Sequence, residues 1–177
     1  MGLNLRKLNA KERFQMDEIT LSNATIFRYA CDTLVEKMNQ GFFESDTNVQ
    51  QEEKTKLKQS LVVPVIVNAS FACELFLKSL LPSNTHGHKL DELFSQLDQN
   101  LQNKIMGLTG LTLKCYNDDY NMEQFQQDLK NNSNDFAEWR YFHEGHSQRA
   151  NLHFLLTFLN VLNRVALEQK AQESSSN

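Results

Sequence analysis

LVVPVIVNASFACELFLKSLL, residues 61–81, is apolar enough to raise the question of a membrane span. Two ionisable side chains inside it, Glu74 and Lys78, argue against that assignment because charges are costly in an isolated span. Apolar residues around the full circumference are typical of a helix at the centre of a soluble bundle. We therefore expect a long central helix over 51–81, kinked or restarted at Pro64 and ended by Pro82, and no membrane partner.

The overall composition favours long helices in a single domain. The chain has 177 residues, of which 40% are hydrophobic and 23% are charged, a balance typical of soluble globular proteins. Six glycines and two prolines signal few turns, which argues against many short strands. We predict an all-α fold that forms one domain over residues 1–172, followed by a disordered tail over 173–177.

Charge and cysteine content restrict the partners and the compartment. The net charge of −4 argues against coating nucleic acid by bulk electrostatics, but it leaves a small local phosphate site open. The three cysteines are odd in number and widely spaced, and Cys31 and Cys73 stand among apolar residues. Residues 1–14 are polar and basic without an apolar core, unlike a secretory signal. We expect a cytoplasmic protein without disulfides.

Apolar spacing at i, i+3 and i+4 predicts the remaining helices. The first, over 17–40, is expected to bury Phe27, Ala30, Cys31, Leu34, Val35 and Met38. Shorter helices are expected over 89–97, 101–106 and 122–130, and from Asn134 or Asp135 to Gly145. The last helix, over 148–171, is expected to carry a polar stripe of His153, Thr157, Asn160 and Arg164. Between 107 and 121, β-forming residues and two glycines indicate an ordered loop or a short hairpin.

FAEWRYFHEGH, residues 136–146, concentrates reactive side chains at the end of one expected helix. Arg140 can hold a phosphate with two N–H groups, and His143 and His146 can move protons near neutral pH. Cleavage of RNA needs both functions, because the 2′-hydroxyl must lose a proton and attack the adjacent phosphorus. Gly145 would free His146 from the helical direction and let it turn toward Arg140. This segment is therefore the candidate catalytic site.

The same segment has a purely structural interpretation. Arg140 and Glu144 stand at i, i+4 and would form a salt bridge that stabilises the helix. Trp139 and Phe142 would then belong to the core. The sequence leaves both interpretations open.

A polar stripe at i, i+4, i+8 crosses the apolar central helix at Ser70, Glu74 and Lys78. Buried charges need partners. Glu74 has two candidates, Lys78 along the same helix or Arg140 across the bundle. In the second case Glu74 would orient the arginine, and in the first the pair is structural.

The histidines do not have the spacing of a metal site. His143 and His146 stand at i, i+3, which is not the His-Glu-x-x-His spacing that puts two ligands on one helical face. His86 and His88 flank a glycine, and neither pair has an evident third ligand. The sequence also lacks a Gly-rich phosphate loop, a nucleophile elbow and Cys-x-x-Cys. We therefore expect neither a metal nor a cofactor.

Three motifs in order resemble a known family. ASFACELFLKSLL, residues 69–81, resembles the long central helix of HEPN domains (higher eukaryotes and prokaryotes nucleotide-binding), where a Glu-Leu-x-Leu-Lys-x-Leu-Leu stretch recurs. GHKLDELF, residues 87–94, is similar to the turn and helix that follow it. Phe-x-x-Trp-Arg-Tyr-x-x-Glu, residues 136–144, resembles a Trp-Arg-Tyr segment that some HEPN-like proteins carry further on. The resemblance is scattered over residues 61–162.

The resemblance implies an all-α bundle of four to five helices with short extra helices, often a homodimer. Many members are metal-independent endoribonucleases that carry Arg-x(4–6)-His, and Arg140 and His146 are separated by five residues. His143 is the substitute for His146. Where the family's catalytic form has Asn, Asp or His directly after the arginine, this chain has Tyr141.

The resemblance also implies roles and partners. Glu144 or Glu74 would orient the arginine. The setting would be a toxin–antitoxin or phage-defence system, with RNA as substrate and a cognate antitoxin or another protein as partner. Non-catalytic HEPN domains also occur, so the alternative is a helical module that binds a nucleotide or a partner protein.

Overall fold

A computed structural model describes residues 16–43, 51–83, 85–141 and 150–175. These residues form helices and no strand, so the predicted all-α class is confirmed for them. The helices are α1 (Glu18–Phe43), α2 (Gln51–Ser79), α3 (Leu90–Ser95), α4 (Gln99–Lys114), α5 (Met122–Asn131), α6 (Asp135–Arg140) and α7 (Leu152–Ser175).

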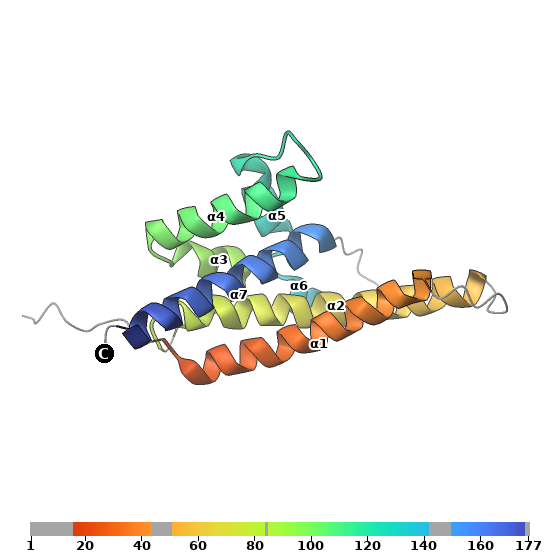
Figure 1. The fold of residues 1–177 in the computed structure, drawn as a ribbon, viewed down its shortest axis with the longest axis horizontal. Helices are drawn as coiled ribbons and strands as arrows, with labels where there is room; N and C mark the ends of the chain where they lie inside the picture. Colours follow the sequence, from red (N-terminus) through yellow and green to blue (C-terminus); the bar gives the residue numbers. More distant parts are fainter. Residues whose placement is uncertain (1–15, 44–50, 84, 142–149, 176–177) are drawn as a thin grey trace, which may run out of the picture.

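The helices are arranged in layers around α2 (Figure 1). Helix α1 lies side by side with α2, and α7 packs on another face of α2. Helix α4 packs on α7, the short helix α3 packs on α2, and α5 packs on both α3 and α4. The six-residue helix α6 packs directly on α2. Helix α2 therefore contacts helices α1, α3, α6 and α7, and it is the central helix that the sequence predicts.

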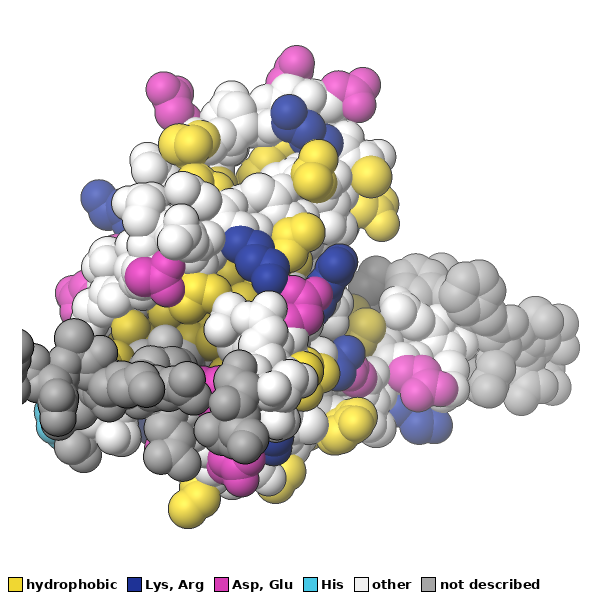
Figure 2. Space-filling model, turned by 60° about the vertical axis from the view of Figure 1, so that its left-hand side comes forward, with side chains coloured by type: hydrophobic (Ala, Val, Ile, Leu, Met, Phe, Trp, Pro, Cys, Tyr) yellow, Lys and Arg dark blue, Asp and Glu magenta, His cyan; other side chains and the backbone are white. Residues whose placement is uncertain are grey.

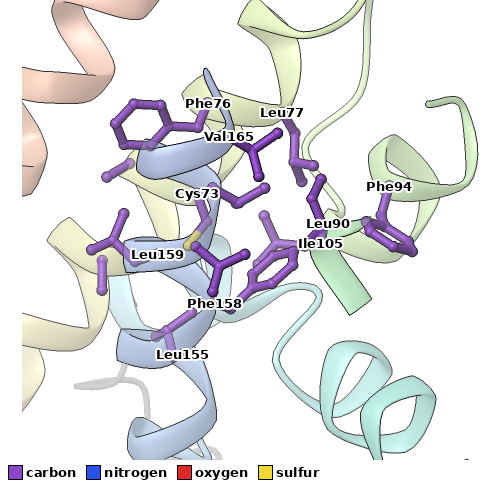
Figure 3. Close-up of a cluster of buried hydrophobic side chains, with 14 of the residues drawn as sticks. Cys73, Phe76, Leu77, Leu90, Phe94, Ile105, Leu155, Phe158, Leu159 and Val165 are labelled. Atoms are coloured by element: carbon purple, nitrogen blue, oxygen red, sulfur yellow. The ribbon is translucent and has the colours of Figure 1, made fainter. Parts of the chain in front are cut away.

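Helix α2 occupies the centre because apolar side chains face each of its neighbours. Figure 3 shows Cys73, Phe76 and Leu77 of α2 together with Leu155, Phe158 and Leu159 of α7 in one buried cluster. Leu90 and Phe94 of α3 and Ile105 of α4 close the cluster from the other layer. Full burial of one such side chain stabilises the fold by about 1.5–3 kcal/mol. The cluster thus ties four helices into one core.

The most apolar part of α2, Ser60–Ser79, is long and apolar enough to cross a membrane, and half of it (50%) is buried inside the fold. No other helix in the described part of the chain passes that test. The central helix of a soluble protein has the same length and composition, so this feature alone does not place the chain in a membrane.

Helix α4 corrects the expectation of a loop or hairpin that begins at residue 107. The helix continues from Gln99 to Lys114 without a break at Gly107 or Gly110. Asp98 caps its first turn by accepting hydrogen bonds from the backbone N–H groups of Asn100 and Leu101. Its buried residues Ile105, Thr109 and Leu113 recur at i, i+4, i+8. This continuous buried face outweighs the low helix propensity of two glycines.

Two expected burial assignments are also wrong. Ala30 of α1 is exposed, although it was expected to face inward with Cys31. Thr157 of α7 is 8% exposed and is buried rather than part of a polar stripe. Helix α7 begins at Leu152, later than the expected start at 148, and its helical backbone continues through Ser175, into the expected tail.

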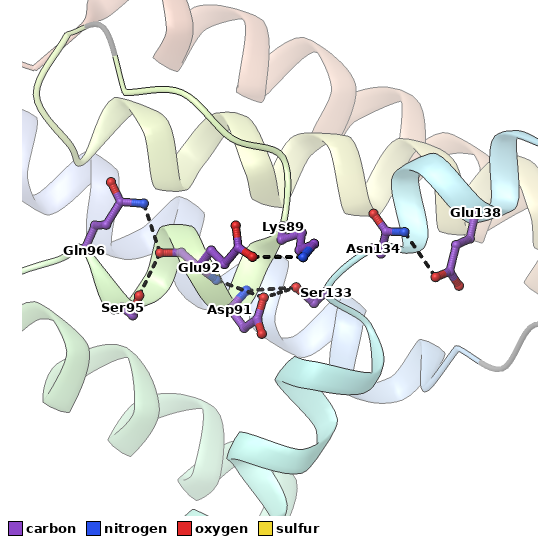
Figure 4. A network of polar contacts seen from close by, with 8 residues as sticks. All are labelled: Lys89, Asp91, Glu92, Ser95, Gln96, Ser133, Asn134 and Glu138. Carbon is purple, nitrogen blue, oxygen red and sulfur yellow. Dashed lines mark hydrogen bonds and ion pairs between the residues drawn. The ribbon is translucent and has the colours of Figure 1, made fainter.

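A network of polar contacts positions the start of α6 (Figure 4). The backbone N–H of Leu90 donates to the carbonyl of Ser133 at 3.0 Å. The N–H of Asp91 donates to the Ser133 hydroxyl at 3.2 Å. The Ser133 hydroxyl in turn donates to the Asp91 carboxylate. Asn132 accepts from the backbone N–H of Asn151, next to the start of α7, at 2.9 Å. The turn before α6 is therefore fixed to both α3 and α7.

Candidate functional site

Arg140 is the exposed last residue of α6, and its guanidinium contacts two aromatic rings. Its guanidinium carbon lies 5.1 Å from the centroid of the Phe136 ring and 4.7 Å from that of Tyr141. Cations are attracted to the faces of such rings. No carboxylate of the described residues forms an ion pair with Arg140. The rings thus hold the guanidinium while no described side chain takes up its N–H groups.

Helix α6 ends earlier than predicted. The helix stops at Arg140 rather than Gly145, with Tyr141 as its C-cap. Glu144, His143 and His146, together with Phe142, lie in 142–149, outside the described residues.

Trp139 is half-buried and packs against the core, as the structural interpretation expected. Trp139 therefore attaches α6 to the core, while the neighbouring Arg140 is exposed to solvent.

A stack of phenylalanine rings connects Arg140 to two long helices. Phe27 of α1 meets Phe71 of α2 edge to face, with ring centroids 4.6 Å apart. Phe71 stacks on Phe136 of α6 at 4.5 Å with an interplanar angle of 17°. Aromatic pairs of this kind contribute about 0.5–1.5 kcal/mol beyond burial. The ring beneath the arginine is therefore held by contacts with α2, and through α2 with α1.

Glu74 is buried on α2 and accepts two hydrogen bonds at one oxygen. It is 1% exposed. Lys78 Nζ lies 2.7 Å from Glu74 Oε1, and His88 Nδ1 lies 2.9 Å from the same atom. Of the two partners considered from the sequence, Lys78 is therefore present and Arg140 is not. The second partner of Glu74, His88, could not be predicted from the sequence. It lies 14 residues further along the chain, in a turn outside α2.

Ser70 does not join this network. Its hydroxyl is buried and donates to the carbonyl of Ile66 at 2.7 Å, one turn earlier in α2. The three residues of the expected stripe therefore have two separate roles. The Ser70 hydroxyl bonds to the backbone of its own helix, and Glu74 and Lys78 form an ion pair.

The turn that carries His88 depends on a glycine. Gly87 has a φ of 115°, in the region that favours glycine over any residue with a Cβ atom. His88 follows directly, with 72% of its side chain exposed although Nδ1 reaches the buried Glu74. His86, on the other side of the glycine, is exposed as well.

Asp135, at the start of α6, is a buried carboxyl that sequence reasoning took only for a candidate helix cap. It is 1% exposed, and neither carboxyl oxygen has a hydrogen-bond partner among the described residues. Burial raises its pKa to about 7, and the nearby Glu138 charge adds to the shift. The indole N–H of Trp139 opposes the shift but falls short of hydrogen-bond geometry. Near neutral pH this carboxyl is close to half protonated.

Metal and thiol chemistry have little support in the described part of the chain. No group of three or more His, Cys, Asp or Glu side chains there could hold a metal ion. The cysteines are free, with Cys31 and Cys73 buried and Cys115 exposed. Burial raises the pKa of Cys31 to about 12, so its thiol is inert at neutral pH.

No protein-family model, curated protein or solved structure matches this chain significantly. The described residues define an all-α helical protein in which a ring-supported arginine, Arg140, ends the short helix α6.

Proposed function

We propose that this protein is a metal-independent endoribonuclease of the HEPN-like type, with Arg140 holding the scissile phosphate. The observation that carries the proposal is the presentation of Arg140. It is exposed, its guanidinium lies against two rings, and no described carboxylate neutralises it. A guanidinium fixed in this way is suited to bidentate contact with a phosphate.

The proposed reaction is transphosphorylation within RNA. A histidine takes the proton from the 2′-hydroxyl, whose oxygen attacks the adjacent phosphorus while Arg140 binds the non-bridging oxygens. The bond from phosphorus to the 5′-oxygen breaks, and a protonated group returns a proton to that oxygen. The products are a 2′,3′-cyclic phosphate and a 5′-hydroxyl. His146 is the proposed proton-transfer residue, with His143 as its substitute and Glu144 as a group that orients the arginine.

The positions of the three resembling motifs support the HEPN-like assignment. Residues 69–81 lie on and just after α2, residues 87–94 form the turn and most of α3, and Phe136 to Arg140 lie on α6. Both α3 and α6 pack on α2, so the three segments meet. On the same resemblance we propose a cytoplasmic homodimer, in a toxin–antitoxin or defence setting with an antitoxin or another protein as partner.

Binding would depend on local contacts, because basic residues do not collect into one track. Figure 2 shows Lys and Arg side chains interspersed with Asp and Glu over one face of the molecule. The net charge is −4. Affinity for RNA should therefore fall with salt only as the few phosphates contacted require, about 0.7 log units per log unit of salt for each phosphate on a single strand.

A second candidate function is a non-catalytic module that binds a nucleotide. It is favoured by a cleft of about 270 Å³ between the end of α4, α5 and the start of α7. Tyr116 and His153 line it, with ring centroids 4.5 Å apart, and Asn117, Gln124 and Gln127 add amide groups. Aromatic rings beside amides suit a nucleobase, which needs a stacking surface and hydrogen-bond partners.

The test is cleavage of a mixed RNA pool in EDTA by wild type, Arg140→Ala, Arg140→Lys and His146→Ala. Arg164→Ala, an exposed arginine on α7, is the matched control. We expect cleavage by wild type and the control, with 2′,3′-cyclic phosphate ends, and severe loss in the other variants. Arginine replaced by lysine should lose activity because a point charge cannot make the bidentate contact. Absence of cleavage by wild type would reject the nuclease in favour of the nucleotide-binding module.

A further inference from the structure

We propose that the groove between α4 and α5 binds a single-chain fatty carboxylate, with the alkyl chain along α4 and the carboxylate at Lys114. The groove has a volume of about 450 Å³, within the range of pockets that hold small organic ligands. Of the residues that line it, only Tyr120 also lines the cleft of the nucleotide-binding alternative. The site is separate from Arg140, so it does not depend on the proposed ribonuclease function.

One face of α4 forms a wall of this groove. The residues of the wall recur at the i, i+3, i+4 spacing of a single helical face, and they are Asn103, Met106, Gly107, Gly110, Leu111 and Lys114. At a rise of about 1.5 Å per residue, the wall is about 16 Å long. An extended alkyl chain of about twelve carbons spans a similar length, because its bonds are about 1.5 Å long.

The lining of the groove is mostly apolar. Phe125 of α5 and Tyr120, just before α5, contribute buried rings. Leu111 and Met122 also line the groove, although they are 67% and 57% exposed to solvent. Exposed apolar surface that is contiguous marks places where apolar groups bind, and methionine adapts to irregular shapes. An alkyl chain suits this lining, since it has no polar group that would lose hydrogen bonds on burial.

Two glycines keep the α4 wall open, and the fold does not require them. A Cβ atom at Gly107 or Gly110 would meet no atom within 4 Å, and neither residue has a positive φ. Glycine weakens the interior of a helix relative to alanine. Both glycines line the groove, so a long side chain at either position would extend into it. Packing therefore gives no reason for these glycines, whereas access of a ligand to the wall does.

Lys114 provides a positive charge at one end of the wall. It is exposed, and it is the only charged residue among the described residues that line the groove. No carboxylate of the described residues forms an ion pair with it. At the other end of the wall stands Asn103, which is uncharged. The groove is therefore complementary to a ligand with an apolar body and one terminal negative charge, and it should disfavour a cationic head group.

The competing explanations are that a second copy of the chain covers the groove, or that its surface binds any alkyl chain. Gly110→Leu fills the groove and at the same time replaces glycine by a better helix former, so it should fold. Its matched control is Thr112→Leu, which adds the same side chain at an exposed position of α4 that does not line the groove. Lys114→Met removes the charge but keeps an unbranched chain, and Lys130→Met, at an exposed position of α5 outside the groove, is its control.

The experiment measures the Kd of octanoate, decanoate, dodecanoate and tetradecanoate by isothermal titration calorimetry, below micelle-forming concentrations. Dodecyltrimethylammonium is the cation of matched chain length. We expect one site per chain, with Kd falling about threefold per added methylene up to about twelve carbons and then levelling off. Dodecanoate should bind more tightly than the cation, and Lys114→Met should weaken dodecanoate binding about fivefold. Gly110→Leu should abolish binding and melt no lower than wild type, while both controls keep the wild-type Kd.

Three results would overturn the proposal. They are no saturable binding of dodecanoate to wild type, a wild-type Kd in Gly110→Leu, and equal affinity for dodecanoate and the cation. Sedimentation velocity tests the second copy. Equal sedimentation of wild type and Gly110→Leu would support a groove that is free for the ligand, whereas a wild-type dimer that Gly110→Leu dissociates would overturn the proposal. None of these readouts involves RNA, so failure of the ribonuclease is distinguishable from failure of this site.

Discussion

The buried carboxyl of Asp135 makes the stability of this fold depend on pH in a predictable direction. Its pKa is raised from 3.8 to about 7 in the folded state because burial disfavours the charged form. Between these two values the folded state keeps a proton that the unfolded chain has lost. The free energy of unfolding should therefore fall as the pH rises from 3.8 to about 7, and the loss should be complete above about pH 7.

The size of the effect follows from the shift. A displacement of about three pKa units corresponds to about 4 kcal/mol, which is an upper figure because water entry and local relaxation reduce it. Asp135→Asn removes the ionisation but keeps the shape of the side chain. Between about pH 5 and about pH 8 the variant should gain up to about 3 kcal/mol of stability relative to wild type.

The assay is urea unfolding followed by far-ultraviolet circular dichroism at both pH values. Two further variants complete it. Glu138→Gln removes a charge that raises the pKa of Asp135, so it should weaken the pH dependence. Asp118→Asn, in an exposed turn, should leave the pH dependence as in wild type. Parallel stability profiles for wild type and Asp135→Asn across this pH range would refute the reasoning.

Three other predictions concern the backbone, the core and the thiols. Gly87→Ala should destabilise the protein by about 1–2 kcal/mol, because the φ of Gly87 is 115°. Gly107→Ala should stabilise helix α4 by about 0.5–1 kcal/mol, because the added Cβ would meet no atom within 4 Å. Urea unfolding of both variants tests this contrast, and equal changes in stability would contradict it. Phe76→Ala should cost about 3–5 kcal/mol, since the ring is fully buried, and a loss below about 1 kcal/mol by the same assay would show that the core is not packed as described. Iodoacetamide should modify the exposed Cys115 first in the native protein, while the two buried thiols react only after unfolding; peptide mass mapping over time tests this order, and early labelling of a buried thiol would contradict it.

The central helix is the part of the fold that the sequence predicts best. The uninterrupted apolar stretch 61–81 marks a helix with neighbours on several sides, and α2 has them. The helix over residues 107–114 is not predicted from the sequence, because Leu-Thr-Gly-Leu-Thr-Leu has weak helix propensity by itself. Burial of Ile105, Thr109 and Leu113 against other layers decides the helix there, and that is a tertiary effect.

The residues of the candidate site could be predicted from the sequence only in part. Arg140 and Glu74 could be selected from the sequence because each is a charge in an apolar or aromatic setting. The partners of these residues could not be selected, since Phe71 and Phe136 are 65 positions apart and His88 reaches Glu74 only through the turn at Gly87. Spacing within a helix predicts local pairs such as Glu74 and Lys78, and contacts between helices need the fold.

The ring stack also determines how far a disturbance travels. Phe27 belongs to α1, the helix on the outer side of α2, yet only two rings separate it from the guanidinium of Arg140. The three rings contact one another without a covalent or hydrogen-bonded link, so their alignment depends on the spacing of the three helices that carry them. A molecule that docks on α1 and shifts it along α2 would therefore tilt the arginine without touching it. Arg140, the proposed phosphate-binding residue, is in this sense mechanically coupled to the surface of α1.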